Sequence, residues 1–238
     1  MVINVYYEIA KVKIAYEVKG EGWPVFLLHG WQMRKETFNS LARDLANDFK
    51  VYQIDLPGFG ESITEAALTI EEYAEIIHQF IVNLEKLPPI LVGHSFGGRI
   101  SIKYASRFPV NKLVLIGTPG IKKPLNFLKK AKQFLYRKWK IGQGSQDYQK
   151  ANGLLRKTLV MAVNDDLSEN LHLIKCPTLL LWGEKDQEVK VSIAKQMQQK
   201  IVQSELVVIP KCGHFPYLER YRYFLIVLRY YLQKEHIC

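Results

Sequence analysis

The stretch that decides the fold is Ile90-Leu91-Val92-Gly93-His94-Ser95-Phe96-Gly97-Gly98. Its first three residues predict a short buried strand, and residues 99–107 predict a helix. A serine placed as G-x-S-x-G between a strand and a helix lies on a tight turn. This turn requires glycine at positions 93 and 97, because a Cβ would collide with the returning chain. We expect the turn to lift the Ser95 hydroxyl above the sheet, where it can act as a nucleophile.

Short apolar runs recur along the chain and predict the strands of a mostly parallel sheet. They are Val25–Leu28, Val51–Ile54, Ile90–Val92, Leu113–Ile116, Thr178–Trp182 and Leu206–Ile209. Nearly continuous apolar runs suit strands that are buried on both faces. Segments of helical period lie between most of them: Thr37–Asn47, Ile70–Leu84, Ile100–Phe108 and Val191–Ile201. Strands that alternate with helices predict an α/β fold with helices on both faces of the sheet.

The two ends of the chain add a hairpin and a final helix. Val2–Ile9 and Val12–Val18 alternate apolar and polar residues, and Ala10-Lys11 between them predicts an antiparallel hairpin. Tyr217–Gln233 is rich in Tyr and Phe and predicts a helix that packs back on the sheet.

The alternation of strands and helices breaks once, between residues 118 and 175, where no strand is predicted. Apolar residues recur there at three- and four-residue steps: Leu125, Leu128, Ala131, Leu135 and Trp139. Lysines occupy the other side, which predicts a basic amphipathic helix, and Tyr148–Val163 predicts a second helix. We interpret residues 118–175 as a helical cap, inserted into an α/β core that comprises residues 1–117 and 176–238.

Length and composition favour an ordinary globular protein. The chain has 238 residues, of which 48% are hydrophobic and 24% charged, as expected for one domain with its own core. No apolar run reaches the length of about 18 residues that a membrane span needs, and the first residues lack the apolar stretch of a signal peptide. We therefore expect a cytoplasmic protein with no transmembrane segment. The three cysteines are too few and too widely spaced for a disulfide framework or a zinc site.

Two further residues are candidates to complete a catalytic triad with Ser95. A serine hydroxyl needs a base that is itself oriented by an acid. Asp186 follows the apolar run that ends at Trp182, and His214 follows the run that ends at Ile209. Loops beyond the carboxyl ends of parallel strands are where such sheets build their sites. We therefore predict Ser95 as nucleophile, His214 as base and Asp186 as acid.

Each assignment has an alternative. Glu184 or Glu188 could supply the acid instead of Asp186, and His214 could be a residue at the entry of a helix. Cys212 lies two residues before His214 and could be mistaken for a nucleophile, although a buried thiol is the commoner role.

An oxyanion needs two backbone donors, and two segments can supply them. One is the Phe96 amide at the start of the helix after the nucleophile. The other is the Trp31 amide in the segment His29-Gly30-Trp31, which follows a predicted strand. Gly30, Trp31 and Phe96 are accordingly expected to contact the substrate. His94, beside the nucleophile, is expected to orient the turn.

Five segments together resemble the α/β-hydrolase superfamily. They are His29-Gly30-Trp31, Asp55–Ser62, Gly93–Gly98, Leu181–Asp186 and Gly213–Glu219. Within the superfamily the sequence resembles small-capped serine esterases, the group that includes a pimeloyl-carrier methyl-ester esterase. C–C bond hydrolases share the same nucleophile turn, whereas dehalogenases and epoxide hydrolases use Asp where this chain has Ser95. The resemblance implies that the Asp55–Ser62 segment is structural.

The resemblance and the predicted triad imply a carboxylesterase. Such an enzyme cleaves carboxylic esters, here expected to carry short to medium acyl chains, through an acyl-enzyme intermediate and with no metal or organic cofactor. A C–C bond hydrolase acting on a diketone-like substrate would use the same triad. A ligand receptor that retains the triad and signals through its cap is a third interpretation.

The formal net charge of +10 is concentrated in one segment. Eight basic residues and no acidic residue lie between Lys122 and Lys140, so that the rest of the chain is close to neutral. One interpretation is a cap helix whose lysines face water. The alternative is a docking surface for an acidic acyl-carrier protein or an anionic membrane surface. Nucleic acid fits less well, because the lysines alternate with an apolar stripe and no nucleic-acid-binding motif is present.

The docking interpretation predicts a selective effect of charge reversal at Lys129, Lys130 and Lys132. Substituting all three by Glu should weaken turnover of a carrier-bound or vesicle-bound ester and spare a small soluble ester. The measurement is hydrolysis of both substrates at low and at physiological ionic strength, since surface attraction is screened by salt. Equal effects on both substrates, or indifference to salt, would contradict docking.

Overall fold

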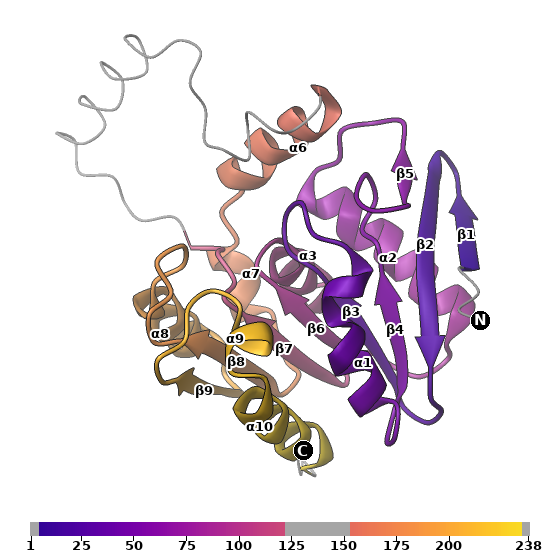
Figure 1. Ribbon diagram of the computed structural model, residues 1–238. Helices are drawn as coiled ribbons and strands as arrows, with labels where there is room; N and C mark the ends of the chain where they lie inside the picture. Colours follow the sequence, from indigo (N-terminus) through magenta and orange to yellow (C-terminus); the bar gives the residue numbers. More distant parts are fainter. Residues whose placement is uncertain (1–4, 122–152, 235–238) are drawn as a thin grey trace, which may run out of the picture.

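The computed structural model describes residues 5–121 and 153–234, and in these residues nine strands form one sheet (Figure 1). The strands are β1 (Val5–Ile9), β2 (Val12–Lys19), β3 (Pro24–Leu28), β4 (Lys50–Ile54), β5 (Ile63–Thr64), β6 (Ile90–His94), β7 (Lys112–Ile116), β8 (Thr178–Gly183) and β9 (Ser204–Ile209). Their order is β1-β2-β4-β3-β6-β7-β8-β9, with β5 paired to β2. Strand β2 pairs antiparallel with β1, β4 and β5, whereas all pairs from β4 to β9 are parallel. The predicted parallel sheet with its N-terminal hairpin is confirmed.

Helices cover both faces of this sheet (Figure 1). They are α1 (Asn39–Leu45), which a 3-10 turn at Lys35–Phe38 precedes, α2 (Ile70–Leu84), α3 (Phe96–Ala105), α6 (Gly153–Asn164), α7 (Ser168–His172), α8 (Val191–Lys200), α9 (Pro216–Glu219) and α10 (Tyr221–Gln233). Successive residues of a strand point to opposite faces. Phe26 and Leu28 of β3 therefore belong to the core on the side of α2, α3 and α8, while Val25 and Leu27 belong to the core on the side of α1 and α10. Burial on both faces explains why these strands are apolar throughout.

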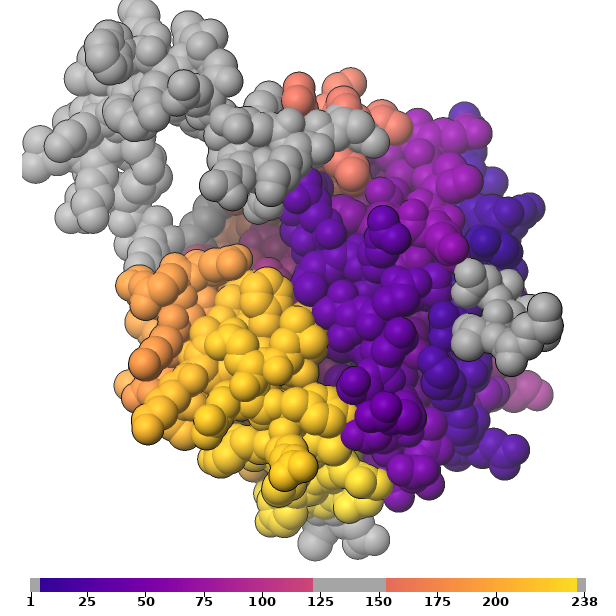
Figure 2. Space-filling model, viewed as in Figure 1, coloured from indigo at the N-terminus to yellow at the C-terminus, as the bar shows by residue number. Residues whose placement is uncertain are grey.

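The candidate residues for catalysis come from segments that are far apart in the sequence. Ser95 lies in the first half of the sequence, and Asp186 and His214 lie in the last third. On the face shown in Figure 2, the N-terminal segments, indigo to purple, meet the C-terminal segments, orange to yellow, along one boundary. Because β6, β7, β8 and β9 are adjacent and parallel, their carboxyl ends lie along the same edge of the sheet.

The predicted helix at Tyr217–Gln233 is divided into α9 and α10, so the prediction of one continuous helix was wrong. Arg220 separates the two with φ −134° and ψ 46°, which is outside the helical region. At the end of α9, the Glu219 carboxylate accepts hydrogen bonds from the backbone amides of Gly213 (2.7 Å) and Phe215 (3.1 Å). These bonds hold α9 against the loop that carries His214, while α10 packs on the sheet.

The described part of the segment 118–175 contains α6 and α7 and no strand. Helix α6 is tied to the core where the Thr158 hydroxyl accepts a hydrogen bond from the backbone amide of Leu68 (3.1 Å). It matches the later part of the predicted helix Tyr148–Val163, whose first residues lie outside the described residues. The predicted basic helix at 125–139 lies wholly outside them. The division of the chain into core and cap stays a prediction.

A buried ion pair holds the turn after β4. Asp55 is fully buried, and its carboxylate accepts hydrogen bonds from the backbone amides of Lys35 (2.7 Å) and Glu61 (3.0 Å) and from Lys35 Nζ (3.3 Å). The Ser62 hydroxyl donates to the Asp55 carbonyl (2.6 Å) and accepts from the Ala15 amide (2.8 Å). The segment from Asp55 to Ser62 therefore joins β2 and β4 to the turn at Lys35, a structural role.

Removing one partner of this pair should destabilise the fold. We expect Lys35→Met to lower the free energy of unfolding by about 3 kcal/mol, because the buried Asp55 carboxylate then loses its cation. Urea denaturation followed by circular dichroism measures the difference. Lys86→Met, at an exposed lysine, is the matched control, and an equal effect of both substitutions would contradict the role of the pair.

Candidate active site

Ser95 lies on a strained turn between β6 and α3. Its φ of 49° and ψ of −107° are unusual for a residue with a side chain. A Cβ at Gly93 would lie 2.5 Å from Ser101 Oγ, and a Cβ at Gly97 would lie 2.2 Å from the carbonyl oxygen of Leu28. Both distances are shorter than any real contact, so the prediction that this turn requires the two glycines is confirmed.

Asp186 and His214 form a buried pair. His214 Nδ1 lies 2.8 Å from Asp186 Oδ2, and the two residues are 7% and 3% exposed. The other carboxylate oxygen of Asp186 accepts hydrogen bonds from the backbone amides of Glu188 (2.9 Å) and Val189 (2.8 Å). The loop after β8 thus fixes one oxygen of Asp186 and leaves the second for the imidazole. This arrangement holds His214 with Nδ1 protonated and Nε2 free to accept a proton.

The alternative acids have other surroundings. Glu184 accepts a hydrogen bond from the backbone amide of Lys211 (2.9 Å). Glu188 has a largely exposed side chain, and its Oε2 lies 3.5 Å from His214 Nε2, on the opposite side of the ring from Asp186. The alternative nucleophile is disfavoured by its chemistry, because burial raises the pKa of the Cys212 thiol to about 11 and the thiolate is the reactive form.

The end of β7 brings Ser95 near the histidine. The backbone amide of Ser95 donates to the carbonyl of Ile116 (2.9 Å). The next residue, Gly117, borders the pair so closely that a Cβ there would lie 3.0 Å from the His214 ring and 3.2 Å from Asp186. In the described part of the chain there is no hydrogen bond between Ser95 and His214. Such bonds are often long before a substrate is bound.

His94 connects the turn at Ser95 to the loop that carries His214. It is 1% exposed, and its Nε2 donates to the backbone carbonyl of His214 (3.0 Å). Its Nδ1 accepts from the Tyr217 hydroxyl (3.2 Å) in α9. These partners assign the neutral tautomer, and burial, with a smaller effect of His214, lowers the pKa of His94 to about 3. His94 therefore positions the loop and does not exchange protons at neutral pH.

The loop after β3 is fixed by His29. This fully buried side chain donates from Nδ1 to the carbonyl of Gly30 (2.8 Å), and its Nε2 accepts from the backbone amide of Leu56 (3.0 Å). The His29 carbonyl accepts from the Gly97 amide (3.1 Å), which brings the loop against the start of α3. Burial lowers the pKa of His29 to about 4. The ring of Trp31 then packs edge-on against that of Phe96, with centroids 5.1 Å apart.

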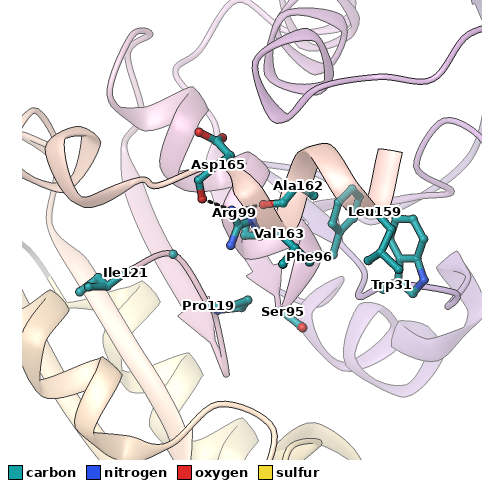
Figure 3. Close-up of a pocket in the computed structure, with 11 residues that line it drawn as sticks. Trp31, Ser95, Phe96, Arg99, Pro119, Ile121, Leu159, Ala162, Val163 and Asp165 are labelled. Atoms are coloured by element: carbon teal, nitrogen blue, oxygen red, sulfur yellow. Dashed lines mark hydrogen bonds between the residues drawn. The ribbon is translucent and has the colours of Figure 1, made fainter. Parts of the chain in front are cut away.

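A cavity of about 300 Å³ opens beside Ser95 (Figure 3). Helix α3 and the loop after β7 form one side, and α6 forms the other. Most of its lining is apolar, and the residues that line it include Trp31, Phe96, Pro119, Ile121, Leu159 and Val163. Of the predicted site residues, Ser95, Trp31 and Phe96 line this cavity, whereas Gly30, Asp186 and His214 do not.

Comparison with known proteins identifies the family of this fold. Residues 25–225 match the model of the alpha/beta hydrolase family. The chain belongs to the α/β hydrolase family. This α/β hydrolase is 28% identical to the pimeloyl-[acyl-carrier protein] methyl ester esterase of Nitrosomonas europaea, over 86% of this chain and 94% of that protein. It is also 28% identical to mouse monoacylglycerol lipase ABHD6, over 83% of this chain and 72% of the lipase.

A solved structure extends the similarity to three dimensions. A thermophilic esterase from Thermogutta terrifontis superposes with a TM-score of 0.77 at 25% sequence identity, and the match covers 95% of each chain. The chain is thus an α/β hydrolase of the esterase and lipase type. Among the described residues, no helix is long and apolar enough to cross a membrane.

Sequence reasoning missed the residues that shape the cavity. Arg99, Asp165 and the α6 residues that line it were not predicted, because the segment that contributes α6 carries no recognisable motif. Arg99 did leave a signal, since it lies four residues after Ser95 and therefore on the same side of the helix.

Two buried neutral histidines should make the α/β hydrolase sensitive to acid. In the unfolded chain His29 and His94 bind protons below a pH of about 6.5, whereas in the fold they stay neutral down to about pH 4 and about pH 3. Unfolding therefore takes up protons, and the free energy of unfolding falls as the pH drops below 6.5. Each histidine contributes about 1.4 kcal/mol per pH unit in this window.

Substitution of one histidine tests this expectation. His94→Asn should make the free energy of unfolding less dependent on pH, by about 1.4 kcal/mol per pH unit between pH 6 and 5. For each variant, the free energy of unfolding is compared with that of the same variant at pH 7. Urea denaturation at several pH values gives the slope. His172→Asn, at an exposed histidine, should leave it unchanged. Equal slopes for His94→Asn and the wild type would show that His94 titrates normally.

Proposed function

We propose that this α/β hydrolase is a serine carboxylesterase that cleaves esters with short to medium acyl chains. The observation that carries the proposal is the buried Asp186–His214 pair beside the strained turn at Ser95, with an apolar cavity opening at the serine. A base with a fixed tautomer near a partly buried serine hydroxyl that lines a cavity is the arrangement that acyl transfer needs.

In the proposed mechanism His214 takes the proton of the Ser95 hydroxyl as its oxygen attacks the ester carbonyl. Asp186 holds the imidazole and stabilises its protonated form. The tetrahedral intermediate collapses, and His214 gives the proton to the departing alcohol. Water then attacks the acyl-enzyme by the same route and releases the acid and free Ser95.

The backbone amides of Trp31 and Phe96 are proposed as the oxyanion donors. Three observations support them. The Gly97–His29 hydrogen bond brings their two segments together, the two side chains are in contact, and neither amide has an acceptor among the described residues. Donors that are fixed before the reaction cost no reorganisation, and one such donor is typically worth about 10²- to 10³-fold in rate.

The cavity supports an acyl chain of limited length. Its volume of about 300 Å³ and its apolar lining suit a short to medium chain better than a long lipid tail. The similarity to an esterase named for a carrier-linked substrate makes an acyl-carrier protein a candidate partner. The basic segment at 122–140 that would meet it lies outside the described residues, and docking there remains part of this proposal.

Hydrolysis of p-nitrophenyl esters of graded acyl length tests the proposed triad. Ser95→Ala should reduce kcat about 10⁶-fold, to the residual level left by binding alone. Asp186→Asn should reduce it about 10⁴-fold, because His214 would then adopt the wrong tautomer. The wild type should show an optimum at short or medium chains.

Two further variants test the alternative nucleophile, Cys212, and the alternative acid, Glu188. Cys212→Ala should retain full activity, and Glu188→Gln should change kcat far less than Asp186→Asn. Unchanged activity in Ser95→Ala would refute the serine mechanism. A wild type inactive on all esters but active on a vinylogous diketone would instead favour the C–C bond hydrolase.

A further inference from the structure

Arg99 is a buried cation in the cavity beside the nucleophile. It lies one helical turn after Ser95 in α3, and its backbone amide donates to the Ser95 carbonyl (3.2 Å). The side chain is 7% exposed and lines the same cavity as Ser95. Figure 3 shows its guanidinium beside Ala162 and Asp165, to which it is hydrogen-bonded. Four residues of helix rise about 6 Å, so the backbone of Arg99 lies one helical turn from that of Ser95, and both residues line one cavity.

Only part of this guanidinium is satisfied by the protein. Its Nη2 donates to the backbone carbonyls of Ala162 and Asp165 at the end of α6. A guanidinium carries five N–H donors, and these two bonds use one nitrogen. Nε is buried and has no hydrogen-bond partner, and Nη1 has no acceptor among the described residues. Three donors of a buried charged group are therefore without acceptors in the described part of the chain.

The charge of Arg99 has no ion-pair partner within 4 Å among the described residues, although the carboxylates of Asp165 and Asp166 lie near enough to act on it. Burial lowers the pKa of Arg99, against the opposing effect of Asp165 and Asp166, yet arginine stays charged in proteins. Buried charges are normally paired, because leaving an ion in a low-dielectric interior without a partner is costly. A buried cation that makes no ion pair with the described residues, in the cavity beside Ser95, is suited to an anion that arrives with the substrate.

A second buried cation shows what a purely structural role looks like in this fold. Lys112 Nζ also meets the end of a helix, and it donates to the backbone carbonyls of Tyr231 (3.4 Å), Leu232 (2.6 Å) and Lys234 (2.6 Å). All three of its N–H donors are used. Arg99 also binds carbonyls at the end of α6, but it does so with Nη2 alone. Its Nε and Nη1 have no acceptor among the described residues and remain available for one in a ligand.

We propose that Arg99 binds an anionic group of the substrate, a carboxylate in the simplest case, so that the preferred esters are half-esters of short dicarboxylic acids or similar charged esters. The planar guanidinium fork matches the two oxygens of a carboxylate. This inference rests on the proposed esterase function, because the anion is placed relative to an ester carbonyl at Ser95.

The test compares matched charged and neutral esters. Monomethyl succinate, glutarate and adipate are paired with methyl butyrate, pentanoate and hexanoate, and acetate esters with and without a carboxylate on the alcohol form a second series. We expect the wild type to have a higher kcat/KM for a charged ester in at least one series. Arg99→Met should reduce that kcat/KM about 10- to 100-fold and change the neutral partner much less. Arg99→Lys, which keeps the charge, should restore part of the preference.

Arg107→Met is the control for losing a cation near the same helix. Arg107 follows α3 on the surface, where it pairs with Glu71 and Glu75. Its substitution should not change kcat/KM in either ester series. If Arg99→Met lowered kcat/KM equally for the charged and the neutral esters, Arg99 would only anchor α6. That result would overturn the proposal. A wild type without preference for a charged ester in either series would also overturn it.

A binding experiment separates this inference from the esterase proposal. Calorimetric titration of free glutarate and adipate into the wild type and into Arg99→Met needs no turnover. If no ester were cleaved but a dicarboxylate bound only when Arg99 was present, the esterase function would fail and the anion site would stand. If esters were cleaved but neither binding nor preference depended on Arg99, the esterase function would stand and the anion site would fail.

Discussion

The whole site depends on how closely the main chain at the start of α3 approaches the end of β3. Gly97 donates its amide to His29, and a Cβ on Gly97 would reach within 2.2 Å of the Leu28 carbonyl. This contact brings the turn that carries Ser95 against the loop that carries Trp31. Any side chain at position 97 would separate the two segments and, with them, the proposed nucleophile and the proposed oxyanion donor at Trp31. The strained conformation of Ser95 persists because the surrounding strands are buried and adjacent, and so hold both ends of the turn in place.

Two buried histidines extend that contact to the rest of the site. His29 joins its own loop to Leu56 after β4, and His94 joins the nucleophile turn to the His214 carbonyl and to Tyr217. Each uses both ring nitrogens, one as donor and one as acceptor, which only a neutral imidazole can do. The fold thus uses histidine here for a geometric purpose, and the cost is that both rings resist protonation. The proposed base differs because Asp186 provides an anion at Nδ1, which stabilises the positive charge that His214 must carry during the reaction.

Much of the core could be predicted from the sequence because its signals are local. The apolar runs predicted the strands, because they reflect burial on both faces. The glycines at 93 and 97 predicted the turn, because the turn has no room for a Cβ at either position. The division of the last helix at Arg220 was not predictable in this way. It depends on Glu219 accepting from Gly213 and Phe215, and apolar periodicity does not register such a contact. The short strand β5 was missed for a similar reason, because its two residues pair with β2 and show no pattern of their own.

The cavity was least predictable because its two walls obey different constraints. Helix α3 must pack on the sheet and carry Ser95, so its sequence is limited by the core. Helix α6 contacts the core where Thr158 accepts from the Leu68 amide, and it contacts α3 through the carbonyls that Arg99 binds. Arg99 therefore contributes to both walls of the cavity. Its backbone amide is bonded to the Ser95 carbonyl in α3, and its guanidinium is bonded to the carbonyls at the end of α6. A residue in that place can set which ester is accepted without altering how Ser95 is held. The chemistry and the selectivity of this enzyme can thus be encoded in the same helix, one turn apart.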